Sequence, residues 1–282
     1  MNSNHSGTLY IVATPIGNLG DMVPRAVETL QSVSVIACED TRHSKKLLDH
    51  FSIEKPCIAY HDHTDKKSSH NILKRLLGGE DVALISDAGT PLISDPGYRL
   101  VSEARQQGYS VIPIPGACAA IAALSVAGLP TDKFKFIGFL PAKTGQRKTS
   151  LAAIKGSTET MVCYEAPHRI ADTIADMVEV FGAERPAFMG REISKTFETY
   201  LQGTMAELLQ LVKADSNQQR GEIVLVVGGA EEDSETVSLD AEKILGLLLK
   251  ELPLTKAASI SAKITGGDKK QLYQLGLSLQ NK

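Results

Sequence analysis

A turn rich in aspartate and glycine follows one short apolar run and has the residue types of a ligand site. The run at 82–85 (VALI) leads directly to Asp87 and Gly89, and a second Asp-Pro-Gly turn begins at Asp95. An aspartate can accept hydrogen bonds from a ligand, and a glycine lets a ligand approach the backbone closely. Open α/β sheets bind ligands beyond the carboxyl ends of their strands. For one such turn alone, an ordinary helix N-cap is the favoured explanation.

The same pattern of an apolar run followed by turn residues occurs three more times in the amino-terminal half. The runs are at 9–13, 33–37 and 111–114, and the last leads into a small-residue helical pattern at 119–127. Nearly continuous apolar runs are typical of strands that are covered on both faces. Strands that alternate with helices indicate βαβ units around a parallel sheet. We therefore expect four strand ends to meet at one edge of this sheet and form a site.

The fold class predicted for the whole chain is α/β, with two domains and a small helical appendage. A domain with a parallel-rich sheet is expected over 8–129, a second domain with a mixed sheet over 130–229, and the appendage over 238–282. In the second domain, strand patterns lie at 134–139, 160–164, 187–193, 196–202 and 222–227, and helical patterns at 170–181 and 205–212. The acidic stretch 230–237 is expected to be a linker. The appendage should hold a helix at 239–252 and two shorter helices after Leu254 and Asp268.

Composition indicates a globular protein without a membrane-spanning segment. Of the 282 residues 43% are hydrophobic, and no apolar run approaches the roughly 20 residues that a transmembrane helix needs. The first eight residues lack the features of a secretory signal, so the expected location is cytoplasmic. The four cysteines are scattered and lack C-x-x-C spacing, which favours reduced thiols over disulfides or a zinc site.

Basic residues are concentrated in two segments although the formal net charge is −3. Residues 133–158 contain six basic and no acidic side chains, and 250–282 contain six lysines against one glutamate and one aspartate. Such segments can neutralise RNA phosphates. We expect 139–148 to form an exposed loop in which Lys143, Arg147 and Lys148 contact RNA. A solvated loop and a solvated tail would explain the charges equally well.

Several common catalytic and nucleotide-binding motifs are missing from the sequence. It contains no G-x-G-x-x-G after a predicted strand, no phosphate loop of the NTPase type and no G-x-S-x-G elbow. His61, Asp62 and His63 have a spacing that could hold a metal, but no third ligand is evident. No metal site is therefore expected.

Seven segments together indicate a family. They are TLYIVATPIGNLGD (8–21), ACEDTRHS (37–44), ALISDAGTPLISDPG (83–97), PIPGACA (113–119), YEAPHR (164–169), GREISKTFET (190–199) and GEIVLVV (221–227). In this order and spacing, the chain resembles over nearly its full length the tetrapyrrole methylase-like superfamily of S-adenosylmethionine-dependent methyltransferases. Within it, the chain is similar to the bacterial enzymes that methylate a cytidine ribose 2′-hydroxyl in small-subunit (16S) ribosomal RNA.

The resemblance implies a homodimer of two-domain subunits, with S-adenosylmethionine bound in a cleft between the domains and ribosomal RNA as the partner. Carried over by motif, the implied cofactor contacts are Pro15, Gly17, Asp87, Gly89, Thr90, Pro91, Ala117, Cys118, Ala119 and Tyr164. Small residues admit a bulky ligand, while Asp87 and backbone groups can bind its polar end. Helix–sheet packing would explain Cys118 and Ala119 equally well.

Methyl transfer to a hydroxyl needs alignment of the reactants and removal of a proton. Asp40, Glu165 and Lys195 are the candidate bases, and Arg42, Arg169 and Arg191 are expected to hold phosphates or to orient acidic partners. A structural ion-pair network is the alternative for each of these residues. Two other functions stay open: methylation of a different acceptor, such as a tetrapyrrole or a protein, and a non-catalytic role in RNA binding or ribosome assembly.

Overall fold

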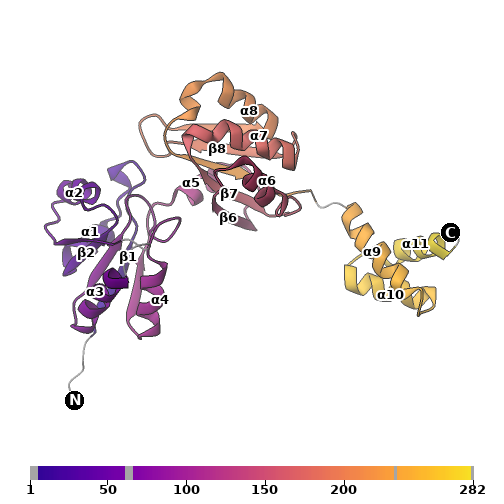
Figure 1. The fold of residues 1–282 in the computed structure, drawn as a ribbon, viewed down its shortest axis with the longest axis horizontal. Helices are drawn as coiled ribbons and strands as arrows, with labels where there is room; N and C mark the ends of the chain where they lie inside the picture. The colour runs from indigo at the N-terminus through magenta and orange to yellow at the C-terminus, as the bar shows by residue number, and fades with distance from the viewer. Residues whose placement is uncertain (1–5, 61–65, 232–233, 281–282) are drawn as a thin grey trace, which may run out of the picture. The chain divides into compact units, whose positions relative to one another are not determined.

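The computed structural model describes residues 6–60, 66–231 and 234–280. His61, Asp62 and His63, which had been considered as metal ligands, lie outside these residues. The chain divides into two compact units, Met1–Gly229 and Ala230–Lys282, which are described separately. The first unit contains two sheets, and the second contains three helices (Figure 1).

The first sheet is parallel and has the strand order β3-β2-β4-β1-β5. Its strands are β1 (Thr8–Val12), β2 (Val35–Cys38), β3 (Cys57–Ala59), β4 (Val82–Ile85) and β5 (Ser110–Ile114). The four predicted strands are confirmed to within two residues at each end. Strand β3 was not predicted, because this edge strand has only three residues and is only partly buried, so its apolar run is too short to stand out.

Helices cover both faces of this sheet, as the continuous apolar runs predicted. They are α1 (Pro24–Ser32), α2 (Thr41–His50), α3 (Lys66–Leu77) and α4 (Tyr98–Gln106). In β4, Val82 and Leu84 pack with side chains of α3 and α4, whereas Ala83 and Ile85 pack with side chains of α1 and α2. Because β1, β2, β4 and β5 run parallel, their carboxyl ends lie at one edge of the sheet.

The second sheet is mixed, also as predicted, with the strand order β6-β7-β10-β8-β9. Its strands are β6 (Phe134–Phe139), β7 (Thr160–Glu165), β8 (Pro186–Arg191), β9 (Thr199–Thr204) and β10 (Ile223–Val227). Strands β6 and β7 are parallel, and the other pairs are antiparallel. Helices α6 (Thr144–Ala152), α7 (Ile170–Phe181) and α8 (Met205–Ala214) supply the side chains packed on one face. The described part of the first unit also contains three short 3₁₀ helices, at Leu19–Asp21, Pro167–Arg169 and Ser216–Gln219.

Helix α5 (Ala119–Val126) packs on the other face of the second sheet. Ala120, Ala123 and Leu124 contact the cluster that includes Val162 and Val224. This helix follows β5 in the chain and therefore connects the two sheets. Helix α5 lies before residue 129 and yet packs on the second sheet. The predicted domain limits therefore remain a prediction.

Two expected irregular segments are partly helical in the structure. The predicted exposed loop at 139–148 is wrong from residue 144 onward, where α6 begins. Pro141 precedes that helix, and Gly145 lies in its first turn, so neither residue interrupts it. The predicted linker 230–237 is also too long, because α9 (Ser234–Leu248) begins inside it. Acidic residues near a helix start are compatible with the helix dipole, and the acidic composition was therefore a poor guide to a loop.

The second unit is a three-helix cluster, as predicted for the appendage. Helices α9, α10 (Leu254–Thr265) and α11 (Lys269–Gln280) pack through Ala241, Leu245, Ala257, Ala258 and Leu272. Gly276 on α11 permits a close approach, since a Cβ there would overlap a methyl group of Leu254. Among the helices that the structure describes, none is both long enough and apolar enough to cross a membrane.

Candidate active site

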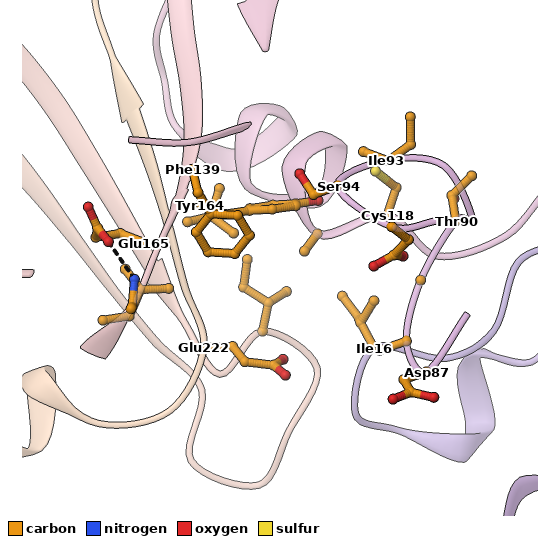
Figure 2. A pocket seen from close by; sticks show the side chains of 18 of the residues that line it. Ile16, Asp87, Thr90, Ile93, Ser94, Cys118, Phe139, Tyr164, Glu165 and Glu222 are labelled. Atoms are coloured by element: carbon orange, nitrogen blue, oxygen red, sulfur yellow. Dashed lines mark hydrogen bonds between the residues drawn. The ribbon is translucent and has the colours of Figure 1, made fainter. Parts of the chain in front are cut away.

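A pocket of about 500 Å³ lies at the carboxyl ends of the first sheet's strands and is also lined by the second sheet (Figure 2). Ile16, Asp87, Thr90 and Cys118 come from the loops after β1, β4 and β5, whereas Tyr164 comes from β7. The other residues that line it are Glu39, Ala88, Gly89, Ile93, Ser94, Asp95, Ala119, Phe139, Glu165, Ala166, Pro167, Ile193, Gly221, Glu222, Ile223 and Val224. The predicted convergence of strand ends is therefore confirmed.

Hydrogen bonds hold the loops of the first sheet together at the pocket. Thr14 and Gly89 exchange N–H···O bonds of 2.9 and 3.1 Å, and the Thr90 hydroxyl donates to the Ala117 carbonyl over 3.0 Å. Gly89 has a φ of +79°, and a Cβ on it would lie 3.3 Å from the Ile16 side chain. Glycine therefore meets both the backbone and the space requirements of this turn.

Six of the ten expected cofactor contacts line the pocket. They are Asp87, Gly89, Thr90, Cys118, Ala119 and Tyr164. The remaining four are Pro15, Gly17, Pro91 and Ala117, which belong to the supporting loops. Ala117 also lines a neighbouring pocket that shares Ile16, Cys118 and Ile193 with the first one.

The charges around the pocket are negative. Asp87 accepts a hydrogen bond from the Asp40 backbone N–H over 3.2 Å. Burial raises the pKa of Asp95, a hydrogen bond from Ser86 lowers it, and the nearby Asp87 charge raises it further. Among the described residues that line this pocket, none is a lysine or an arginine. The pocket therefore favours a cationic ligand group over an anionic one.

Glu165 is buried and engaged by several donors. Its side chain is 0% exposed, forms an ion pair with Arg169 and accepts hydrogen bonds from the Thr173 hydroxyl at 2.7 Å and the Ala166 N–H at 2.6 Å. The dashed line in Figure 2 marks the bond to Ala166. Arg169 also donates to the Leu140 carbonyl over 3.0 Å. These contacts hold the YEAPHR segment against the end of β6. Glu165 and Arg169 are therefore both engaged by other groups of the protein.

Arg191 and Lys195 organise the loop between β8 and β9. Arg191 is 7% exposed and donates to the Thr199 hydroxyl and the Phe197 carbonyl over 3.0 and 2.9 Å. Lys195 forms ion pairs with Glu192 at 2.7 Å and Glu222 at 3.1 Å. Burial lowers the pKa of Lys195, but the hydrogen bonds to the two glutamates outweigh this effect and raise it overall.

The β8–β9 loop also contacts the loop that follows β1. The Ser194 hydroxyl donates to the Asp21 carboxylate. The Lys195 side chain lies so close to Gly17 that a Cβ there would overlap its Cγ. Gly17 therefore provides the space that Lys195 occupies, and this explains its place in the motif without a direct ligand contact.

Asp40 is the N-cap of α2. It accepts hydrogen bonds from the backbone N–H groups of Arg42 at 2.8 Å and His43 at 3.3 Å, and these bonds lower the pKa of Asp40. The Arg42 side chain is 93% exposed and lies 3.8 Å from the Asp40 carboxylate. Arg42 is thus free to contact a ligand from solvent, whereas Asp40 stabilises the helix start.

The three basic residues expected to contact RNA have different environments. Lys143 is exposed. Arg147 is not: its side chain is 2% exposed and forms an ion pair with Asp176 at 2.6 Å. Lys148 pairs with Glu179 and lies 3.7 Å from Asp176. The expectation of an exposed Arg147 is therefore wrong, because α6 turns this side chain inward against α7.

Several pocket residues had received no role from the sequence. Phe139 and Phe136 pack edge-on against Tyr164, with ring centroids 5.7 and 5.0 Å away, and Figure 2 shows Phe139 beside Tyr164. Glu222 and Asp95 also line the pocket. The Asp-Pro-Gly turn at Asp95 was visible, but nothing in its spacing showed that the loop returns to the site. In the part of the chain that the structure describes, no group of His, Cys, Asp or Glu could hold a metal ion.

Comparison with known proteins agrees with this architecture. The profile of the Tetrapyrrole (Corrin/Porphyrin) Methylases matches residues 8–209, and that of the RsmI C-terminal HTH domain matches residues 235–280. "Ribosomal RNA small subunit methyltransferase I" of Pseudomonas aeruginosa is 54% identical, covering 98% of this chain and 99% of its own length. The protein of that name from Escherichia coli O157:H7 is 48% identical, with coverages of 98% and 97%.

Solved structures share the fold at low sequence identity. Diphthine synthase has a TM-score of 0.59 and 13% identity, with 79% of this chain and 90% of that chain covered. Uroporphyrin-III-C-methyltransferase from Thermus thermophilus has a TM-score of 0.56 and 20% identity, with 79% and 94% covered. The predicted fold class is confirmed by these neighbours and by the two sheets. With a profile match over most of its length and full-length relatives near 50% identity, this chain belongs to the tetrapyrrole methylase family.

Proposed function

We propose that the protein transfers a methyl group from S-adenosylmethionine to the ribose 2′-hydroxyl of a cytidine in small-subunit (16S) ribosomal RNA. The observation that carries this proposal is the similarity over nearly the whole chain to proteins named ribosomal RNA small subunit methyltransferase I, including the carboxyl-terminal helices. The cytidine, the ribose oxygen and the cofactor go beyond those names and rest on the motif resemblance.

The pocket fits S-adenosylmethionine in size and charge. A volume of about 500 Å³ is within the range of small-molecule sites. The ligand carries a sulfonium and an ammonium group, which suit a pocket lined by Asp87 and Asp95 and by no described basic side chain. We assign its binding to Asp87, Gly89, Thr90, Cys118, Ala119 and Tyr164, with Pro15, Gly17, Pro91 and Ala117 shaping the loops behind them.

The bound cofactor would supply an electrophilic methyl group, and the chain has to align the acceptor and accept a proton. Alignment of two reactants alone can contribute about 7–11 kcal/mol to a rate enhancement. Of the three proposed bases, Asp40 has a lowered pKa, and a lower pKa makes a weaker base. Lys195 has a raised pKa and is held as a cation, while Glu165 is saturated by its donors. Their surroundings suit positioning roles better.

RNA contacts are proposed on exposed basic side chains. Lys143 and Arg42 are exposed, and Lys148 retains 32% exposure of its side chain. Arg169 and Arg191 already donate to protein groups and are better suited to holding the YEAPHR segment and the β8–β9 loop. The second unit, which matches an HTH profile, adds further exposed lysines on α10 and α11.

A homodimer and a cytoplasmic location are part of the same proposal. Ile121 and Val126 on α5 are 50% and 56% exposed, which gives the first unit apolar surface that a second copy could cover. Light scattering of the purified protein tests the dimer.

The activity is tested with methyl-labelled S-adenosylmethionine and small ribosomal subunits from cells that lack this protein. We expect label on one cytidine ribose of the small-subunit RNA, located by nuclease digestion and mass spectrometry. Subunits from cells that contain the protein serve as the control, because their site is already methylated. Cofactor binding without labelled RNA would contradict the proposal and favour another acceptor or a binding-only role.

A further inference from the structure

The loop between β4 and α4 brings a second aspartate, Asp95, back to the pocket. Asp87 opens this loop at the end of β4, and Asp95 follows eight positions later, yet both line the pocket. Leu92 and Ser94 have φ values of +73° and +68°, an uncommon conformation for residues other than glycine, and such residues gather at functional sites. The loop is therefore folded back in a defined way.

Close packing at Gly97 holds the end of this loop. Gly97 has a φ of +137°, and a Cβ there would lie 2.9 Å from the side chains of both Leu84 and Leu92. Leu84 belongs to the core of the first sheet. Asp95 thus stands two residues before a backbone position that the core fixes, so its carboxylate has a constrained location at the pocket wall.

The partners of Asp95 leave it able to accept a proton. It receives a hydrogen bond from Ser86 and, among the described residues, forms no ion pair. The groups that face it are Ser86 and Asp87 from its own loop and Tyr164 from β7. Partial burial together with Asp87 gives Asp95 a raised pKa, which strengthens it as a base relative to an exposed aspartate.

Three other carboxylates near the site have partners or positions that oppose this role. Glu165 is paired with Arg169 and bonded to Thr173, and Glu222 is paired with Lys195. Asp40 caps α2 and does not line the pocket. Among the described residues, Asp95 therefore combines a place in the pocket wall with the absence of a cationic partner, and its pKa is raised.

We propose that Asp95 is the general base that takes the proton from the acceptor hydroxyl during methyl transfer. This inference rests on the proposed function and names a residue for its proton-transfer step. The hydroxyl oxygen forms a bond to the methyl carbon, and the carbon–sulfur bond breaks with its electron pair remaining on sulfur. The O–H bond breaks as its proton passes to the Asp95 carboxylate, which later releases it to water. Charge balances because the sulfonium becomes a neutral thioether.

The test compares Asp95→Asn, Asp95→Glu and the wild type in single-turnover methyl transfer at saturating cofactor and subunits. We expect Asp95→Asn to slow transfer by about 10²–10⁴-fold, the usual contribution of a positioned base. Asp95→Glu should recover part of the rate. Cofactor affinity by calorimetry and the thermal unfolding midpoint should match those of the wild type. Asp132→Asn, an exposed aspartate before β6 and outside the pocket, is the matched control and should react normally.

The pH profile gives a readout that a structural role would not affect. Since only the ionised carboxylate accepts a proton, the wild-type rate should fall as pH decreases through the pKa of Asp95. That fall should come at a higher pH than the ordinary aspartate value of about 3.9. Asp95→Asn should lack this limb of the profile.

Three results would overturn the assignment. They are an Asp95→Asn rate close to the wild type, a retained acidic limb in that variant, or a loss of cofactor affinity of about tenfold or more that identifies Asp95 as a cofactor ligand. Wild-type protein that binds cofactor but labels no small-subunit RNA would overturn the proposed function and this role together. A labelled wild type with an equally active Asp95→Asn variant would overturn the role of Asp95 alone.

Discussion

Each carboxylate around the pocket has a different set of partners, and the partners decide what that carboxylate can do. Glu165 forms an ion pair with Arg169 inside the protein, whereas Asp87 lines the pocket and accepts a backbone hydrogen bond from Asp40. A charged acceptor that faces a ligand forms stronger hydrogen bonds than a neutral one. The two residues are therefore suited to different tasks although both are carboxylates in family motifs.

Asp87→Asn should weaken the binding of S-adenosylmethionine. The substitution keeps the side-chain shape and removes the negative charge from a pocket that has no described basic residue. Loss of a charge-assisted hydrogen bond costs about 1.5–3 kcal/mol, which corresponds to a dissociation constant about 10- to 150-fold larger. Isothermal titration calorimetry measures the change, with Asp132→Asn as the control. Unchanged affinity would show that Asp87 does not contact the cofactor.

At the level of single residues, sequence motifs named a minority of the residues that line the pocket and did not give the direction of every side chain. Asp87, Thr90 and Tyr164 were expected at the site and do line it. Asp95 and Glu222 were not, because their positions depend on a loop that folds back and on the turn before β10. Ion pairing also depends on tertiary structure, so the basic character of Arg147 gave no sign of its contact with Asp176.

The position of a basic residue on its helix decides whether the side chain is buried in the protein or exposed to solvent. Helix α6 directs Arg147 toward α7, where it also donates to the Ala142 carbonyl and the Thr144 hydroxyl over 3.2 Å each. A buried pair of this kind becomes costly when one partner is removed, because the other charge stays buried without compensation. The direction in which α6 points the Arg147 side chain, rather than its charge alone, therefore gives this arginine a structural role.

Arg147→Leu should destabilise the protein by about 3–5 kcal/mol, since it removes the close partner of the buried Asp176 and leaves only Lys148, 3.7 Å away, to compensate its charge. Lys143→Gln, four residues earlier and exposed, should change the unfolding free energy by less than about 0.5 kcal/mol. Urea unfolding followed by circular dichroism distinguishes the two variants. Equal midpoints for Arg147→Leu and the wild type would contradict a structural role for this arginine.

Gly17→Ala should disturb the contact between the β1 loop and the β8–β9 loop. The added methyl group would overlap the Lys195 side chain and displace it from Glu192 and Glu222. Overpacking of this kind typically costs about 1–3 kcal/mol. Thermal unfolding and cofactor titration provide the measurements.

Gly145→Ala is the matched control for this change, because nothing lies within 4 Å of a Cβ at that position and alanine is a better helix former. It should leave stability equal or slightly higher. If Gly17→Ala and Gly145→Ala had the same unfolding midpoint and cofactor affinity, the packing of Lys195 over Gly17 would contribute nothing to stability or binding.

Local patterns were sufficient to predict the strands, since continuous apolar runs identified four of the five strands in the first sheet. The failures have physical causes. Strand β3 is short and only partly buried, and the polar sequences of α6 and of the start of α9 resemble loops until their packing or helix-dipole preferences are considered. Helix α5 shows a further limit, because its apolar sequence predicted burial but not the sheet on which it packs.

At the scale of the whole molecule, positive charge is concentrated in the last two helices of the second unit. The chain as a whole is acidic, with a formal net charge of −3, yet α10 and α11 contain four lysines and no acidic residue. Lys256, Lys263, Lys269 and Lys270 are all exposed. The separate profile match over 235–280 shows that this unit has its own sequence pattern. We therefore expect its lysines to act in substrate docking and not in cofactor binding.

Replacement of Lys263, Lys269 and Lys270 by glutamine should weaken binding to small ribosomal subunits and make it less dependent on salt. Each phosphate contact releases counterions and contributes about 0.7–0.9 to the slope of log K against log salt concentration, so three lost contacts should reduce the slope by about 2–3. Filter binding at several salt concentrations measures this slope, and calorimetry should show unchanged affinity for S-adenosylmethionine. Lys213→Gln on α8, also exposed, is the control for a general loss of positive charge. A triple variant with the wild-type slope would show that the helical unit makes no electrostatic contact with the subunit, and docking would then depend on Arg42 and Lys143 in the first unit.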